Sequence, residues 1–218
     1  KGLDPPDLVA HTFRRGLRIA QMAYSSGTNR DFGTKYAGGA DQDHHNLTRL
    51  GGQLADALLD NYVLLDVSHV GTSSALQLIE KARERNRPVL ANHANAQTVY
   101  DDSRDYGCDG DKSRNHSDEV ICAVAQTGGV VGITPIRFML RPIQGVKDNC
   151  KRIKASENDF ITHLDYMAKG MKCTTRSGKS INMVNHVGVG SDSPANGYTP
   201  KAEWVYTKMG ARYKRWLR

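Results

Sequence analysis

The sequence lacks the long apolar segments and nucleotide-binding loops that would place it in several large protein classes. Of its 218 residues 39% are apolar, yet no stretch approaches the roughly 18 consecutive apolar residues of a membrane-spanning helix. No GxGxxG or GxxxxGK[ST] loop is present, which argues against a nucleotide-binding sheet. We therefore expect one globular domain over residues 1–218, without a membrane-spanning segment.

Cysteine is sparse, and its spacing is uninformative. The chain has four cysteines, Cys108, Cys122, Cys150 and Cys173, with no CxxC or Cys/His zinc spacing among them. Their even number is weak evidence for disulfides, and we expect each one to be a free, buried thiol. The cellular compartment is left open.

The formal charge of +7 is concentrated at the end of the chain. Residues 201–218 contain six basic side chains and one acidic side chain, with apolar residues at helical spacing. This pattern predicts an amphipathic helix packed on its own domain, and a nucleic-acid-binding helix is the alternative. Because no nucleic-acid-binding motif accompanies the tail, we expect no nucleic-acid partner.

Short apolar runs alternate with stretches of helical periodicity. The apolar runs are nearly continuous, as in parallel strands that are covered on both faces. Alternation of this kind predicts an α/β fold with a parallel sheet. The expected strands are 17–22, 62–67, 88–91, 129–133 and 186–190, and the expected helices are 47–59, 73–86, 117–126 and 157–170. Ser117 is the expected N-cap of the third helix.

Polar side chains follow every expected strand. Tyr24 and Asn29 follow the first strand, His69 the second, His93 the third, Thr134 the fourth and Asp192 the fifth. In a (β/α)8 barrel the carboxyl ends of all strands converge on one face, where active sites are built. A doubly wound sheet also gathers ligands at strand ends, so this pattern alone does not decide between the two folds.

His69 and His93 are separated by 24 residues, the length of one βα unit. Two imidazoles at equivalent positions on neighbouring strands could bind one metal ion, although a single histidine at a strand end is more often structural. Asp192 could move a proton from a metal-bound water, or simply cap the next turn. Arg114 could hold a substrate carboxylate through two hydrogen bonds, or be an ordinary surface arginine. The adjacent pair His44 and His45 is expected to lie in a solvated loop, with a substrate lid as the alternative.

Six stretches of the chain, in order, resemble the membrane (renal) dipeptidase family, peptidase family M19 of the amidohydrolase superfamily. Each stretch is weak by itself, but the ordered set is specific. They are 16–18, 65–70, 88–96, 114–119, 128–133 and 186–192.

The resemblance implies a (β/α)8 TIM-type barrel that hydrolyses the peptide bond of dipeptides with two zinc ions. His69 and His93 match the histidine pair that ligates one zinc, and Asp192 matches the aspartate beside the bridging water. Arg114 matches the arginine that holds the terminal carboxylate of the substrate. Tyr24 falls where some members carry a histidine that stabilises the tetrahedral intermediate. Asn29, after the same strand, is a further candidate for substrate binding.

The chain also departs from the family pattern. The family has a His-x-Asp pair and a bridging Glu upstream of the matched region, and no His-x-Asp occurs here before residue 69. We therefore expect an incomplete barrel that lacks N-terminal strands and C-terminal helices, and the activity of the chain alone is left open. Arg104 is a rival to Arg114 as carboxylate anchor. Other small amides or lactams as substrates, a non-catalytic binding protein, and a homodimer are also left open.

Overall fold

The protein is built around a five-stranded parallel sheet. The computed structural model describes residues 8–24, 35–40, 42, 44–100, 114–140 and 156–190. The strands pair in the order β1-β2-β3-β4-β5, which is also their order along the chain. Their bounds are β1 Ile19–Gln21, β2 Leu64–Asp66, β3 Val89–Ala91, β4 Val130–Ile133 and β5 Val187–Val189.

Helices connect the strands. The α-helices are α1 Leu8–Arg14, α3 Arg49–Asp60, α4 Thr72–Glu84, α5 Asp118–Gln126, α6 Arg137–Leu140 and α7 Glu157–Asp165. A π-helical turn, Tyr166–Gly170, continues α7, and short 3₁₀ turns cover Gln97–Val99 and Met183–His186. The four helices and five strands predicted from the sequence are confirmed, with ends that differ by a few residues.

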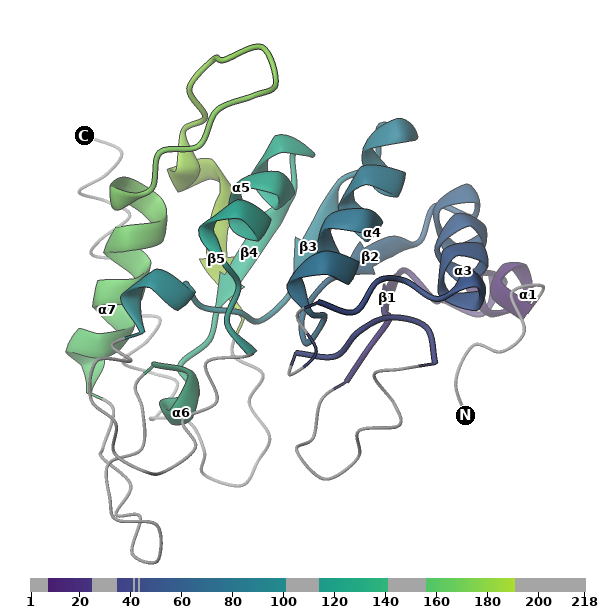
Figure 1. Cartoon of the computed structure of the whole chain (residues 1–218), viewed down its shortest axis with the longest axis horizontal. Coiled ribbons are helices and arrows are strands. Elements are labelled where there is room, and N and C mark those ends of the chain that lie inside the picture. Colours follow the sequence, from purple (N-terminus) through teal and green to yellow (C-terminus); the bar gives the residue numbers. More distant parts are fainter. Residues whose placement is uncertain are drawn as a thin grey trace, which may run out of the picture.

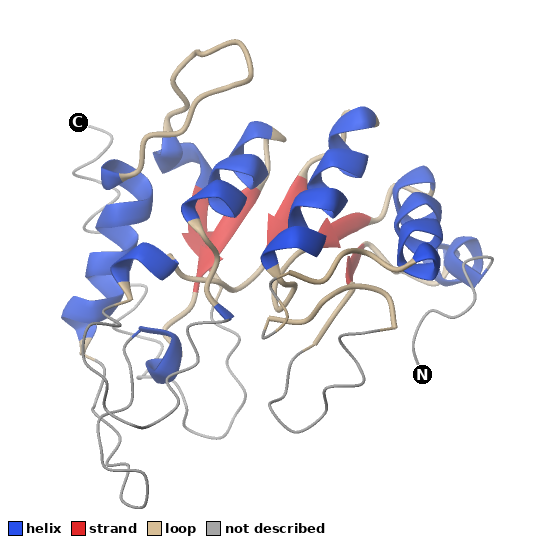
Figure 2. Ribbon diagram, viewed as in Figure 1, coloured by secondary structure: helices blue, strands red, loops and turns tan. Residues whose placement is uncertain are grey.

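The strand order confirms the incomplete (β/α)8 barrel that the family resemblance implied, and it excludes the doubly wound sheet that the strand pattern alone left open. A doubly wound sheet reverses its strand order at a switch point and carries helices on both faces. Here the order does not reverse, and α3, α4 and α5 lie side by side along one face of the sheet (Figures 1 and 2). The described residues therefore form an arc of a (β/α)8-type barrel, with its helices on the outside.

Burial explains why these segments adopt this arrangement. The β2, β3 and β4 strands contribute Leu65, Val89, Ala91, Val131 and Ile133, all of which are completely buried. The helices present one apolar face to this layer, as α3 does with its four buried side chains Leu54, Ala55, Leu58 and Leu59. Strands buried on both faces have nearly continuous apolar sequences, which is the pattern that predicted them.

Side-chain caps begin two of the helices. The hydroxyl of Ser117 accepts a hydrogen bond from the Val120 amide at the start of α5, so the predicted N-cap is confirmed. Thr48 caps α3 in the same way, through the Gly51 amide. Among the described residues, no helix has the length and apolar character needed to cross a bilayer.

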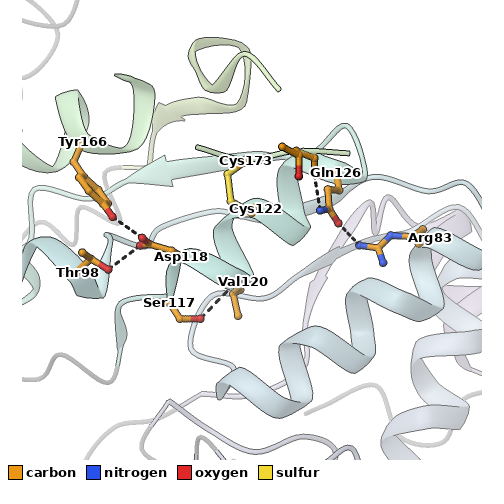
Figure 3. Close-up of a disulfide and its surroundings, with 10 residues drawn as sticks. Arg83, Thr98, Ser117, Asp118, Val120, Cys122, Gln126, Tyr166 and Cys173 are labelled. Carbon is orange, nitrogen blue, oxygen red and sulfur yellow. Dashed lines mark hydrogen bonds between the residues drawn. A yellow bond between two sulfur atoms is a disulfide. The ribbon is translucent and has the colours of Figure 1, made fainter. Parts of the chain in front are cut away.

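The prediction of free thiols is wrong for two of the four cysteines. Cys122 of α5 forms a disulfide with Cys173, and their Cα atoms are 5.3 Å apart (Figure 3). The partners are 51 residues apart in the sequence, so only the tertiary structure brings them together. Cys108, Cys150 and the basic tail at 201–218 lie outside the described residues.

Candidate metal and substrate site

Two histidines meet at the carboxyl ends of β2 and β3. His69 follows β2 and His93 follows β3, and both side chains are buried, with 3% and 7% exposure. Their Nε2 atoms are 2.7 Å apart, so one ring donates a hydrogen bond to the other. The predicted proximity of the two imidazoles is therefore present in the structure.

The backbone after β2 turns sharply to aim His69 toward His93. The amide of Val70 donates to the carbonyl of Val67, which closes a four-residue turn with Ser68 and His69 at its centre. His69 has a φ of +62°, a left-handed conformation that is uncommon for residues other than glycine. Such conformations persist where the surrounding structure holds them, and they are frequent at functional sites.

A buried carboxylate and hydroxyl connect the two strand ends. Asp66 and Ser68 are 3% and 0% exposed. The Asp66 Oδ1 accepts hydrogen bonds from the Ser68 amide (2.9 Å), the Ser68 hydroxyl (2.7 Å) and the Asn92 amide (3.0 Å). The Ser68 hydroxyl in turn accepts from the His93 amide at 3.0 Å. The segments that carry His69 and His93 are thus tied to one carboxylate oxygen.

The backbones of neighbouring strands also pack closely at this carboxyl edge of the sheet. A Cβ atom on Gly190 would lie only 1.6 Å from the carbonyl oxygen of Asn92, and one on Gly132 only 2.2 Å from it. Glycine at these two positions lets β4 and the end of β5 approach the residue that precedes His93.

Tyr24 and Arg114 complete the described part of the site. The Tyr24 ring lies 4.7 Å, centroid to centroid, from the ring of His69, and 53% of the tyrosine is exposed. Arg114 is half-buried just before α5 and is close enough to act electrostatically on His69. The site therefore combines a phenol, two imidazoles and a guanidinium from four separate segments of the chain.

The electrostatics keep one of these imidazoles neutral. Burial, followed by the charges of His93, Arg114 and His116, lowers the pKa of His69 from 6.5 to about 3. His69 is therefore neutral at pH 7, and a neutral imidazole has the lone pair that a metal ligand needs.

Two of the predicted site residues, Asn29 and Asp192, lie outside the described residues, as does Arg104. The prediction of a solvated loop agrees with the exposed side chains of His44 and His45.

Sequence reasoning missed the contributions of Asp66 and His116. Both were present in the stretches that resemble the family, but neither was singled out. The signal for Asp66 was an aspartate two residues before a serine, a pattern that favours a local Asx turn. His116 is buried and raises the positive potential around His69, and its position two residues after Arg114 was the available signal.

The donor set fits a divalent transition metal in part. Two imidazole nitrogens face each other, and the Nδ1 atom of buried His69 has no hydrogen-bond partner. Imidazole is a preferred ligand of zinc and of related metals. Within the described ranges, however, no group of three or more His, Cys, Asp or Glu side chains could hold a metal ion. The described part of the chain contributes a two-histidine pair.

Solved structures share this fold over about half of their own length. A metallopeptidase from Rhodobacter sphaeroides, solved with a phosphinate mimic of the dipeptide L-Ala-D-Ala, is 21% identical with a TM-score of 0.66; the match covers 95% of this chain and 53% of that one. The probable dipeptidase PvdM from Pseudomonas aeruginosa is 18% identical with a TM-score of 0.66, covering 90% of this chain and 55% of that one.

An amidohydrolase from Pseudomonas aeruginosa is 21% identical with a TM-score of 0.63, covering 88% of this chain and 47% of that one. At such low identities these likenesses establish the fold. No curated protein sequence matches the chain.

The family assignment comes from the sequence itself. Residues 5–202 match the family described as membrane dipeptidase, peptidase family M19. This match covers most of the 218 residues and agrees with the order of the six stretches described above. The chain is a member of the membrane dipeptidase family, peptidase family M19.

Proposed function

We propose that the protein is a zinc-dependent hydrolase of dipeptides. The observation that carries this proposal is the His69–His93 pair, whose Nε2 atoms lie 2.7 Å apart at the carboxyl edge of the parallel sheet. In (β/α)8 enzymes this edge is where catalytic groups gather. Membership of family M19 supports a metal-dependent peptidase, and the chain spans about half the length of the solved structures that share its fold.

His69 and His93 are the residues that would hold the metal in this chain. His69 is neutral at pH 7, because burial lowers its pKa to about 3, and its lone pair is therefore available for coordination. When bound, a divalent zinc ion supplies Lewis acidity that activates water and polarises the scissile carbonyl. The remaining ligands are expected from parts of the natural protein outside the described residues.

Arg114 is proposed to orient the substrate. A guanidinium presents parallel N–H groups that match a carboxylate, and a dipeptide always has a free terminal carboxylate beside its single peptide bond. Such an anchor selects the C-terminal peptide bond of a substrate, because an internal peptide bond of a longer chain has no carboxylate at that distance. Asn29 is a further proposed contact to the substrate.

Two other side chains are proposed to act on the reacting atoms. The hydroxyl of Tyr24, which is exposed beside His69, can donate a hydrogen bond to the oxygen that becomes negatively charged. The carboxylate of Asp192 can accept a proton from the attacking water and return it to the departing amine.

The metal is tested first in the natural full-length protein. We expect about two zinc ions per chain by elemental analysis, as in two-metal hydrolases. The His93→Ala variant should lose zinc and at least about 100-fold in kcat/KM, since metal-centred activation of water is lost. The matched control is His44→Ala, because His44 is an exposed histidine and is not one of the proposed metal ligands. A zinc-free wild type that hydrolyses dipeptides at full rate would refute the proposal.

The anchor is tested with a pair of substrates. Wild-type protein should prefer a dipeptide over its C-terminal amide, because only the free carboxylate forms charge-assisted hydrogen bonds with Arg114. Arg114→Ala should reduce that preference by about 10- to 100-fold, which corresponds to a net loss of about 1.4–2.7 kcal/mol of carboxylate binding. An unchanged preference in this variant would assign the anchor to another residue, with Arg104→Ala as the companion variant.

A further inference from the structure

The hydrogen bonds behind the histidine pair converge on a single atom. The Oδ1 of Asp66 accepts three of them, two from Ser68 and one from the Asn92 amide of the neighbouring strand end. Hydrogen bonds to a carboxylate are charge-assisted and are roughly twice as strong as neutral ones. One buried atom thus joins the turn after β2 to the backbone after β3.

The Ser68 hydroxyl extends this link to the histidines. It donates to Asp66 and accepts from the backbone amide of His93, while Ser68 itself is the residue before His69. Its donor and one acceptor site are therefore used by the two segments that carry the imidazoles. Rotating either segment would break at least one of these buried bonds.

The left-handed backbone of His69 is the conformation that the hydrogen bonds to Asp66 would stabilise. Left-handed φ values cost of order 1–3 kcal/mol in residues other than glycine, and they persist only where neighbouring contacts hold them. His69 has a φ of +62° directly after Ser68. The bonds to Asp66 are made within this same turn, in the structure in which the two Nε2 atoms lie 2.7 Å apart.

We propose that Asp66 and Ser68 are positioning residues that set His69 and His93 as one metal-ligand pair; the metal part of this inference rests on the proposed function. They touch neither metal nor substrate, and they act through the backbone of the two histidines. Groups that orient metal ligands in this way typically contribute about 10- to 100-fold in metal affinity.

The chain offers a matched control for Ser68. Ser74 is also completely buried, and its hydroxyl also joins two segments, accepting from the Gly38 amide (2.8 Å) and donating to the His45 carbonyl (2.6 Å). Ser68→Ala and Ser74→Ala should therefore lose similar stability, since each removes one buried hydroxyl with two bonds. Only the first removes a bond to the histidine pair.

The experiment compares these variants in the full-length protein. Zinc affinity is measured by calorimetric titration of the metal-free protein with Zn²⁺, and folding by circular dichroism. Ser68→Ala should weaken zinc binding by about 10-fold or more, Ser74→Ala by less than about 2-fold, and Ser68→Thr, which keeps the hydroxyl, should restore affinity. Asp66→Asn keeps the shape of the side chain and loses its charge. If Ser68→Ala does not fold, the zinc affinity of Asp66→Asn tests the positioning role in its place.

A second readout needs no metal. In metal-free protein, the ¹⁵N resonances of the His69 and His93 rings report which nitrogens carry protons and whether the two Nε2 atoms still share a hydrogen bond. Ser68→Ala should shift both Nε2 resonances, and Ser74→Ala should leave them in place.

The outcomes separate this inference from the proposed function. A wild type without zinc affinity but with shifted ring resonances in Ser68→Ala would refute the metal site and support the positioning role. Unchanged resonances in Ser68→Ala, or equal loss of zinc affinity in Ser68→Ala and Ser74→Ala, would overturn the positioning role and leave the metal site intact.

Discussion

The disulfide between Cys122 and Cys173 allows a quantitative prediction. Replacing both cysteines by alanine releases a cross-link between positions 51 residues apart. In the chain-entropy model, closing a loop of this length stabilises the folded state by about 4 kcal/mol, and measured effects are commonly about 2–4 kcal/mol. We expect the free energy of unfolding of the double variant to be lower than that of the wild type by an amount within this range.

The same loss can be expressed as a change in melting temperature. The unfolding entropy is about 2.1 cal/mol/K per residue, so over 218 residues a loss of about 2–4 kcal/mol lowers Tm by roughly 4–9 °C. The urea m-value should rise, because the unfolded chain without the cross-link exposes more surface. Urea and thermal unfolding of wild type and the double variant, both without reductant, measure these changes.

Neighbouring contacts supply the control. The same loop is also held by Arg176, which pairs with Glu80 and is 67% exposed. The side chain of Gln126, labelled in Figure 3, donates to the Thr174 carbonyl of this loop. An exposed ion pair contributes at most about 1 kcal/mol, so Arg176→Ala should change stability much less than the double cysteine variant. Equal losses in the two variants, or an unchanged m-value, would refute the cross-link argument.

Three further predictions concern stability. Burial lowers the pKa of His163 from 6.5 to about 4, so the unfolded state binds a proton before the folded state does as the pH falls through this range. The free energy of unfolding should therefore drop by about 2 kcal/mol between about pH 7 and about pH 5. In urea titrations, His163→Gln should remove that part of the pH dependence. Gly190→Ala should lower the free energy of unfolding by more than about 2 kcal/mol, since its Cβ would lie 1.6 Å from the Asn92 carbonyl oxygen. Gly188→Ala should be tolerated, because its Cβ would lie 3.5 Å from Val130. Similar Tm values for the two variants would contradict this prediction. Ser117→Ala should cost about 1 kcal/mol by losing the α5 cap, a loss that Ser117→Asp should not show.

The local sequence determined most of the secondary structure. Continuous apolar runs such as 62–67 and 129–133 predicted buried strands, and β2 and β4 lie within them. This works because strands covered on both faces are apolar along most of their length, whatever the rest of the fold is. The Ser117 cap was equally local, since capping involves only the first turn of the helix.

The site was predicted in part. The sequence indicated that His69 and His93 follow neighbouring strands, and the structure gives the distance between their Nε2 atoms. The link that Asp66 makes between the two strand ends was not recognised, because one of its three hydrogen-bond donors, the Asn92 amide, lies 26 residues away on the next strand end. The disulfide was wrongly predicted as free thiols for the same reason.

The sequence by itself therefore determined which segments form strands and helices, which family the chain resembles and that His69 and His93 follow neighbouring strands. Only the tertiary structure showed the order of the strands in the sheet, the joining of Cys122 to Cys173, and the hydrogen bonds that link both strand ends to Asp66. The physical reason is the range of the interactions. Periodicity and capping act over a few neighbouring residues, whereas strand order, disulfide pairing and a shared buried acceptor depend on segments that meet only after the chain has folded.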